Sequence, residues 1–181
     1  MNQDIHHLLR DQALNAAVQH YTADVIRAAT ETVLRLQPKN NKQSGMREHQ
    51  LRNLVNVALS AQHIEEIAAF ILYQMGRGYQ MGRGENSGPW NYEQFGDTVI
   101  HDLMSGAVRQ AAQHAQRMTL TTIESSRMTF TLSSEEQDNL LRDAHIALAR
   151  RYLGYLNRLF YFADKTRRWD KLANLLKGGV A

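Results

Sequence analysis

The chain of 181 residues contains no cysteine, and this absence excludes several kinds of site at once. A disulfide scaffold, a thiolate zinc site, an iron–sulfur cluster and a cysteine nucleophile all need that residue. Long apolar runs are also missing, because the longest, from Ile67 to Tyr73, is far short of the ~20 residues of a membrane helix. The N-terminal residues Met1 to Asp4 do not resemble a signal peptide. We therefore expect a soluble, cytoplasmic protein with no membrane partner.

Apolar residues make up 43% of the chain and charged residues 22%, which is enough to form a core. The apolar residues recur at spacings of three and four. This spacing predicts amphipathic helices over residues 2–36, 46–59, 64–75, 92–118 and 134–163, with a last helix near 169–176. Ser133 and Ser134, followed by Glu136 and Gln137, form overlapping capping-box signatures. Ser60 is a second N-cap candidate. The prediction is an all-α bundle of five to seven helices, in one domain spanning residues 1–181.

Three segments depart from this periodicity and are predicted to be flexible loops, at about residues 37–45, 76–91 and 119–133. The second contains Pro89 and several glycines, so helical order is expected to stop there. A hexapeptide, Tyr-Gln-Met-Gly-Arg-Gly, occurs twice in tandem from Tyr73 to Gly84. Because a loop tolerates such a duplication, the repeat indicates an exposed, extendable segment. The third segment is rich in Thr and Ser, and a short strand or hairpin arm is an alternative for it.

Positive charge is concentrated near the C-terminus. Residues 1–141 contain 12 basic and 15 acidic side chains, whereas residues 142–181 contain nine basic and three acidic ones. A basic segment of this density is typical of a protein that binds a polyanion. A solvated helix face is the alternative interpretation.

Several of these cations lie close to aromatic residues along the chain. Guanidinium groups bind phosphates and aromatic rings stack on bases, so this pattern favours nucleic-acid binding. Solvation or ion pairing is the alternative for the arginines, and core packing for Tyr152 and Tyr155. The RNA-binding candidates are Arg52, Arg77, Arg83, Arg150, Arg151, Arg158, Lys165 and Arg168.

One pattern suggests an enzyme instead. His101-Asp102 follows an apolar pair and resembles the doublet of HD-domain metal phosphohydrolases, with His63 upstream and Asp143 or Asp164 downstream as further ligands. Adjacent helical residues diverge by about 100° around the axis, so both reach one metal only with support from other helices. The sequence contains no P-loop and no Gly-x-Ser-x-Gly elbow. We therefore expect no enzymatic activity, no cofactor and no metal, and keep the phosphohydrolase as the alternative.

Three segments together resemble a known family: Glu48 to Leu54, Ile67 to Arg77, and Ala147 to Phe160. They are similar to the small α-helical subunits of type III CRISPR effector complexes, in which a Gln-x-Arg-Asn-like helix start precedes a Tyr-x-x-Gly-Arg-like helix end and an aromatic final helix. The resemblance covers about residues 46–84 and 140–164. The duplicated hexapeptide and the segment 119–134 depart from the compact form of the family.

This resemblance implies a non-catalytic, cytoplasmic component of an RNA-guided ribonucleoprotein that acts in antiviral defence. Its expected partners are the duplex of guide and target RNA, the other effector subunits, and further copies of itself in a filament. Arg52 and Arg77 are the positions that the resemblance assigns to RNA, and Arg83 follows from its copied motif. In such complexes base pairing specifies the target, while the protein supplies charge and shape.

Overall fold

The computed structural model describes residues 2–39, 44–79, 88–126 and 132–177, and helices dominate these ranges. The helices are α1 (Asn2–His20), α2 (Thr22–Leu34), α3 (Glu48–Ser60), α4 (Ile64–Tyr79), α5 (Phe95–Met104), α6 (Ala107–Ser125), α7 (Ser134–Thr166) and α8 (Trp169–Leu176), with a 3-10 turn at Tyr92–Gln94. No strand occurs within these ranges. The predicted all-α bundle is confirmed.

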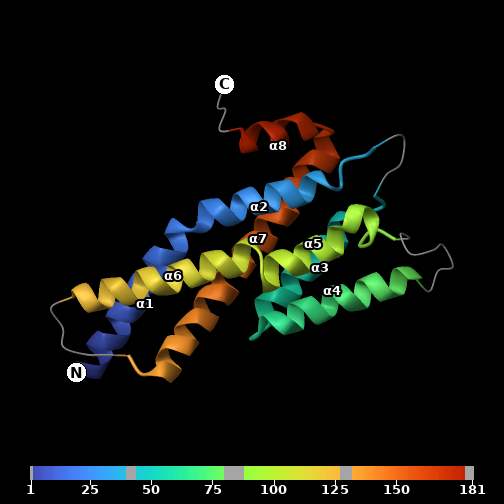
Figure 1. The fold of residues 1–181 in the computed structure, drawn as a ribbon. Coiled ribbons are helices and arrows are strands. Elements are labelled where there is room, and N and C mark those ends of the chain that lie inside the picture. The colour runs from blue at the N-terminus through green and yellow to red at the C-terminus, as the bar shows by residue number, and fades with distance from the viewer. Residues whose placement is uncertain (1, 40–43, 80–87, 127–131, 178–181) are drawn as a thin grey trace.

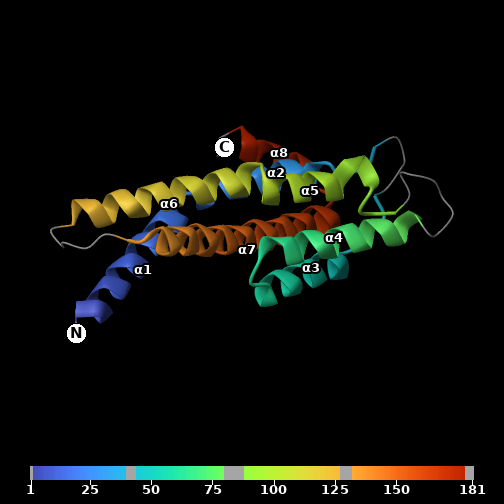
Figure 2. The same cartoon turned by 60° about the horizontal axis from the view of Figure 1, so that its bottom comes forward.

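Helix α7, with 33 residues, is the central element of the bundle. It packs most extensively on α2, α6 and α3. Figure 2 shows α7 running between the α5–α6 row on one side and the α3–α4 pair on the other. Its inward positions include the fully buried Leu148, Tyr152 and Leu156. Removal of these side chains from water is the main force that assembles the other helices around α7.

The start of α7 has the predicted capping box. The Ser133 hydroxyl accepts a hydrogen bond from the Glu136 backbone N–H at 3.3 Å, and the Ser133 backbone N–H donates to Glu136 Oε2 at 2.7 Å. The Ser133 hydroxyl also donates to Glu136 Oε2 at 2.8 Å, and the two bonds that this carboxyl accepts from Ser133 lower the pKa of Glu136, because they favour its ionised form. The sequence signature therefore located this helix end correctly.

Two of the predicted helices are divided in the structure. The single helix expected over residues 2–36 is wrong, because the chain bends at Tyr21 and continues as α2 (Figure 1). The bend lets α1 pack mainly on α6 while α2 packs on α7. The helix expected over 92–118 is divided between Met104 and Ala107, and a Cβ added at Gly106 would lie 2.8 Å from the His101 ring.

Two predicted loops begin later than expected. Helix α4 continues through Gly76 and Gly78 to Tyr79, since each glycine costs only about 1 kcal/mol in a helix that is already formed. Helix α6 continues through Thr119 and Thr122 to Ser125. Each of those three hydroxyls donates to the carbonyl four residues earlier, so the polar side chains are satisfied within the helix. Of the remaining residues of these two predicted loops, 88–91, 126 and 132–133 are not helical, whereas 80–87 and 127–131 lie outside the described residues.

The N-cap prediction for Ser60 is also wrong. Ser60 is the last residue of α3, and its hydroxyl lies 3.0 Å from the Val57 carbonyl oxygen. The start of α4 is capped instead by Glu66, whose Oε1 accepts from the backbone N–H groups of Gln62 and His63, both at 2.9 Å. These bonds lower the pKa of Glu66.

Candidate nucleic-acid interface

The outward side of α7 carries a row of alternating cations and aromatic rings. Its members follow at steps of four or three residues, which places them on one face of the helix. We call this row the basic–aromatic stripe; it consists of Arg151, Tyr155, Arg158, Tyr161 and Lys165. It spans about 21 Å along the helix axis. Tyr161 is 47% exposed, and both Arg158 and Lys165 are exposed.

Within the stripe, cations lie over the neighbouring rings. The Arg158 guanidinium is 5.6 Å from the centroid of the Tyr155 ring, and Lys165 Nζ is 5.7 Å from that of Tyr161. Residues 144–163 of α7 include no Asp or Glu, and the one acidic residue within the span of the stripe, Asp164, is paired with Arg167 at 3.1 Å. The stripe therefore presents mainly positive charge and aromatic surface, which suits phosphates and stacked bases.

Two predicted cations, Arg151 of the stripe and its neighbour Arg150, stand at the N-terminal end of the stripe. Arg151 is half-buried, and its Nη1 donates to Gln19 Oε1 at 2.8 Å and to the Thr22 hydroxyl. A shallow cavity of about 290 Å³ lies here, lined by Thr22, Arg150, Arg151, Gly154, Tyr155 and Arg158. None of these residues is acidic, so the charges are held in position but are not neutralised there.

The Arg150 side chain binds backbone carbonyl oxygens at the end of α3. Its Nε donates to the Ala58 carbonyl at 3.0 Å, and its Nη2 lies 3.2 Å from the carbonyl oxygens of Leu59 and of Ala61. These oxygens belong to the C-terminal end of α3, where helical carbonyls lack partners within the helix. Arg150 therefore joins α3 to α7, and this contact is a structural use of a residue predicted to bind RNA.

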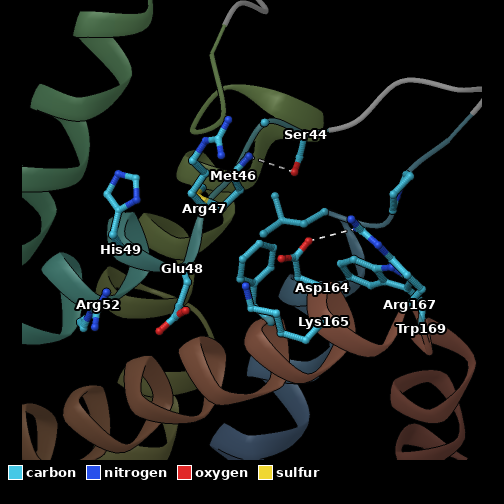
Figure 3. A pocket seen from close by; sticks show the side chains of 14 residues that line it. Ser44, Met46, Arg47, Glu48, His49, Arg52, Asp164, Lys165, Arg167 and Trp169 are labelled. Carbon is cyan, nitrogen blue, oxygen red and sulfur yellow. Dashed lines mark hydrogen bonds and ion pairs between the residues drawn. The ribbon is translucent and has the colours of Figure 1, made fainter.

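Lys165, at the other end of the stripe, also borders a second and larger cavity (Figure 3). This cavity has a volume of about 390 Å³ and lies between the start of α3 and the end of α7. We call it the α3–α7 pocket. Arg47, Arg52, Lys165 and Arg167 supply its cations, and Glu48 and Asp164 its carboxylates. The fold thus places Arg52 and Lys165 on one cavity although 113 positions separate them in the sequence.

Arg47 did not emerge as a candidate from the sequence. It directly precedes α3 as the N-cap residue, and its backbone N–H donates to Gln50 Oε1 at 3.0 Å. The signal that could have found it is a basic residue at a helix start, where the helix itself already favours anions.

The other predicted cations lie outside both the basic–aromatic stripe and the α3–α7 pocket. Arg77 is on the last turns of α4, with its guanidinium 5.9 Å from the centroid of the Tyr73 ring. Arg168 forms a bidentate ion pair with Asp170, with both distances 3.0 Å. That pairing raises the pKa of Arg168 and lowers that of Asp170, so the charge of Arg168 is compensated locally. Arg83 lies outside the described residues.

The His101-Asp102 doublet of the phosphohydrolase alternative has one exposed and one mostly buried side chain. The His101 side chain is 68% exposed, whereas that of Asp102 is 14% exposed. Asp102 Oδ2 lies 2.8 Å from the Tyr152 hydroxyl and 3.0 Å from the Thr32 hydroxyl. Each hydroxyl has one proton and a carboxylate can accept from both, so Asp102 is satisfied as a structural acceptor.

The remaining aspartates of that alternative are paired with arginines. Asp143 Oδ2 lies 2.6 Å from Arg10 Nη2, and Asp164 Oδ1 lies 3.1 Å from Arg167 Nη1. Within the described ranges, no group of three or more His, Asp or Glu side chains is arranged to hold a metal ion. The described residues therefore contain no metal centre of the kind that the phosphohydrolase alternative requires.

One histidine on the inner side of α7 is buried. His145 is 6% exposed, and its Nε2 lies 2.7 Å from the Leu103 carbonyl oxygen. Because a carbonyl only accepts, Nε2 carries the proton, which leaves Nδ1 as the acceptor for Arg109 Nη1 at 3.3 Å. Burial of the imidazole lowers the pKa of His145, and the nearby Arg109 charge acts in the same direction.

No family model, curated protein or solved structure matches this chain. Among the helices of the described residues, none combines the length and the apolar character that crossing a bilayer requires.

Proposed function

We propose that this protein is a non-catalytic, RNA-contacting subunit of an RNA-guided ribonucleoprotein. The observation that carries the proposal is the basic–aromatic stripe, because it joins three cations and two rings along one face of α7, and the one acidic residue within its span, Asp164, is already paired with Arg167. Such a surface holds a strand by its phosphates and accepts stacked bases of any sequence. Recognition of sequence then falls to base pairing with a guide strand.

The resemblance to the small subunits of type III CRISPR effectors supports the same proposal. In this proposal the chain is cytoplasmic and acts in antiviral defence. Its partners are the guide–target RNA duplex, the other subunits and further copies of itself. Arg151, Arg158 and Lys165 are the proposed phosphate contacts, and Tyr155 and Tyr161 the proposed stacking rings. Arg150 contributes by positioning α3, since its donors already bind the α3 carbonyls.

The test is the binding of single-stranded RNA oligonucleotides of two unrelated sequences, measured by fluorescence anisotropy over a range of salt concentrations. The double variant Arg151→Gln/Arg158→Gln removes two charges while it retains hydrogen-bond donors. We expect its affinity to fall about tenfold for both sequences. The slope of log affinity against log salt concentration should become less negative by about 1.4, since each phosphate that a cation neutralises on a single strand contributes about 0.7 to the slope and two cations are removed.

The matched control is Arg27→Gln/Arg117→Gln, which removes two exposed charges from α2 and α6, outside the stripe. We expect both affinity and salt slope to stay close to those of the native protein. Equal losses in the two double variants, or an unchanged slope in the first, would remove the stripe from RNA binding.

A further inference from the structure

The α3–α7 pocket carries a second proposal; the pocket shares Lys165 with the stripe but has its own cavity and its own cations, Arg47 and Arg52. We propose that this pocket binds a phosphate monoester, the dianionic group found at the end of an RNA strand and on a nucleoside monophosphate. The pocket differs from the stripe in shape, because it is a recess of about 390 Å³ between two helices and a loop. A recess of this size accepts a small ligand or a chain end.

The charges of the pocket match a dianion. Four cations and two carboxylates line it, so its net charge is +2 with His49 neutral. Arg167 is paired with Asp164 at 3.1 Å. Arg47, Arg52 and Lys165 have no carboxylate within ion-pair distance in the part of the chain that the structure describes. A phosphate monoester has a charge near −2 and three free oxygens, so it can meet several cations at once.

The cations approach from opposite walls. Figure 3 shows Arg47, His49 and Arg52 on the α3 side, and Asp164, Lys165 and Arg167 on the α7 side. A group seated between them would be contacted from two directions. A strand crossing the open stripe, in contrast, meets the protein from one side only. This arrangement favours a terminal group over a phosphodiester within a strand.

The walls and floor are held in place without a ligand. Leu36, Phe160 and Trp169 line the pocket and are buried, and the rings of the last two lie 6.5 Å apart in an edge contact. Gly45 has a φ of +69°, a conformation that favours glycine, and buried Met46 anchors the chain that follows it. The apolar floor of the pocket is therefore formed by the fold itself, while the exposed side chains of Arg47, Arg52 and Lys165 stand around it.

The closing experiment uses adenosine 5′-monophosphate, with adenosine as the uncharged comparison, at constant ionic strength in isothermal titration calorimetry. We expect the monophosphate to bind at least ten times more tightly than adenosine. Arg47→Ala and Arg52→Ala should each weaken the monophosphate about tenfold. Glu48→Gln should strengthen it a fewfold, because Glu48 is the carboxylate among the described lining residues that forms no ion pair, whereas Asp164 is paired with Arg167. Arg117→Ala, on α6 and outside both the pocket and the stripe, should leave the affinity for the monophosphate unchanged.

Thermal unfolding of each variant establishes that it is folded. Equal binding of adenosine and its monophosphate would overturn the proposal. An Arg52→Ala variant with native affinity and a native unfolding midpoint would overturn it too.

A second arm distinguishes the two sources of the phosphate. One RNA sequence is compared with a 5′-phosphate, with a 3′-phosphate and with hydroxyl ends. If a terminal phosphate tightens binding and Arg52→Ala abolishes that gain, the ligand is a strand end. If only the free monophosphate responds to Arg52→Ala, it is a mononucleotide. Either result supports the pocket, and hydroxyl-ended RNA tests the stripe separately.

Discussion

The two sides of α7 use the same kinds of residue in opposite ways. On the inner side, Tyr152 and His145 are buried and their polar atoms have partners on α2, α5 or α6. On the outer side, Arg158, Tyr161 and Lys165 are exposed, and the two cations lie over the rings of Tyr155 and Tyr161. Polar groups facing inward are therefore part of the stability of the fold, whereas those facing outward remain available to a ligand.

The largest effect on stability is expected on the inner side from Tyr152→Phe. The variant removes the hydroxyl that lies 2.8 Å from Asp102 Oδ2 and leaves a mostly buried carboxylate with fewer donors. Burial, aided by the Asp102 charge, raises the pKa of Tyr152, so this hydroxyl is a proton donor at neutral pH. We expect a loss of about 1.5 to 3 kcal/mol in the free energy of unfolding, measured with urea. A change below about 0.5 kcal/mol would show that the inner hydroxyl is not structurally required.

A smaller effect is expected from the protonation of His145. Its pKa is lowered in the folded state, so the unfolded chain binds the proton more readily. The stabilising contribution is complete above the ordinary histidine pKa of about 6.5 and is lost as the pH falls below it. The measurement is the urea midpoint between pH 7.5 and 5.5, compared with His145→Gln, which keeps a donor for the Leu103 carbonyl. A pH dependence of equal size in the variant would assign it to other histidines.

The smallest effect on stability is expected on the outer side, from Arg158→Ala. This residue is exposed and its recorded contact is the cation–π interaction with Tyr155. Such exposed contacts contribute about 0.5 kcal/mol, so the urea midpoint should barely move. A loss as large as that of Tyr152→Phe would mean that the two sides of α7 do not differ in the way described above.

Local features of the fold were predictable from the sequence. The capping box at Ser133 and Glu136, and the apolar spacing of α7, involve residues near one another in the chain. The loop predictions were less accurate because they relied on residue type alone. Gly76 and Gly78 remain within α4, and Thr119 and Thr122 within α6, since a helix already stabilised by packing tolerates them.

The candidate site was predictable only in part. Clustering along the chain indicated the cations of α7, but it could not show that Arg150 binds the α3 carbonyls, which requires the packing of two helices distant in sequence. It also could not bring Arg52 to Lys165, or show that Asp170 compensates Arg168. The sequence identifies which residues carry charge, whereas the tertiary structure determines which charges remain uncompensated.

The contact between Arg150 and the end of α3 has a consequence for the opposite end of that helix. Helices α3 and α7 run antiparallel, so Arg150 binds the C-terminal end of α3. Along the helix axis, Arg47 lies about 17 Å from Ala58 and Arg52 about 9 Å from it, and both border the same cavity as Lys165. Buried Leu51 and Leu54 also hold α3 against the core. Arg150 adds to this packing and so helps to set the separation of Arg47 and Arg52 from Lys165, although it is not among the described residues that line the cavity between them.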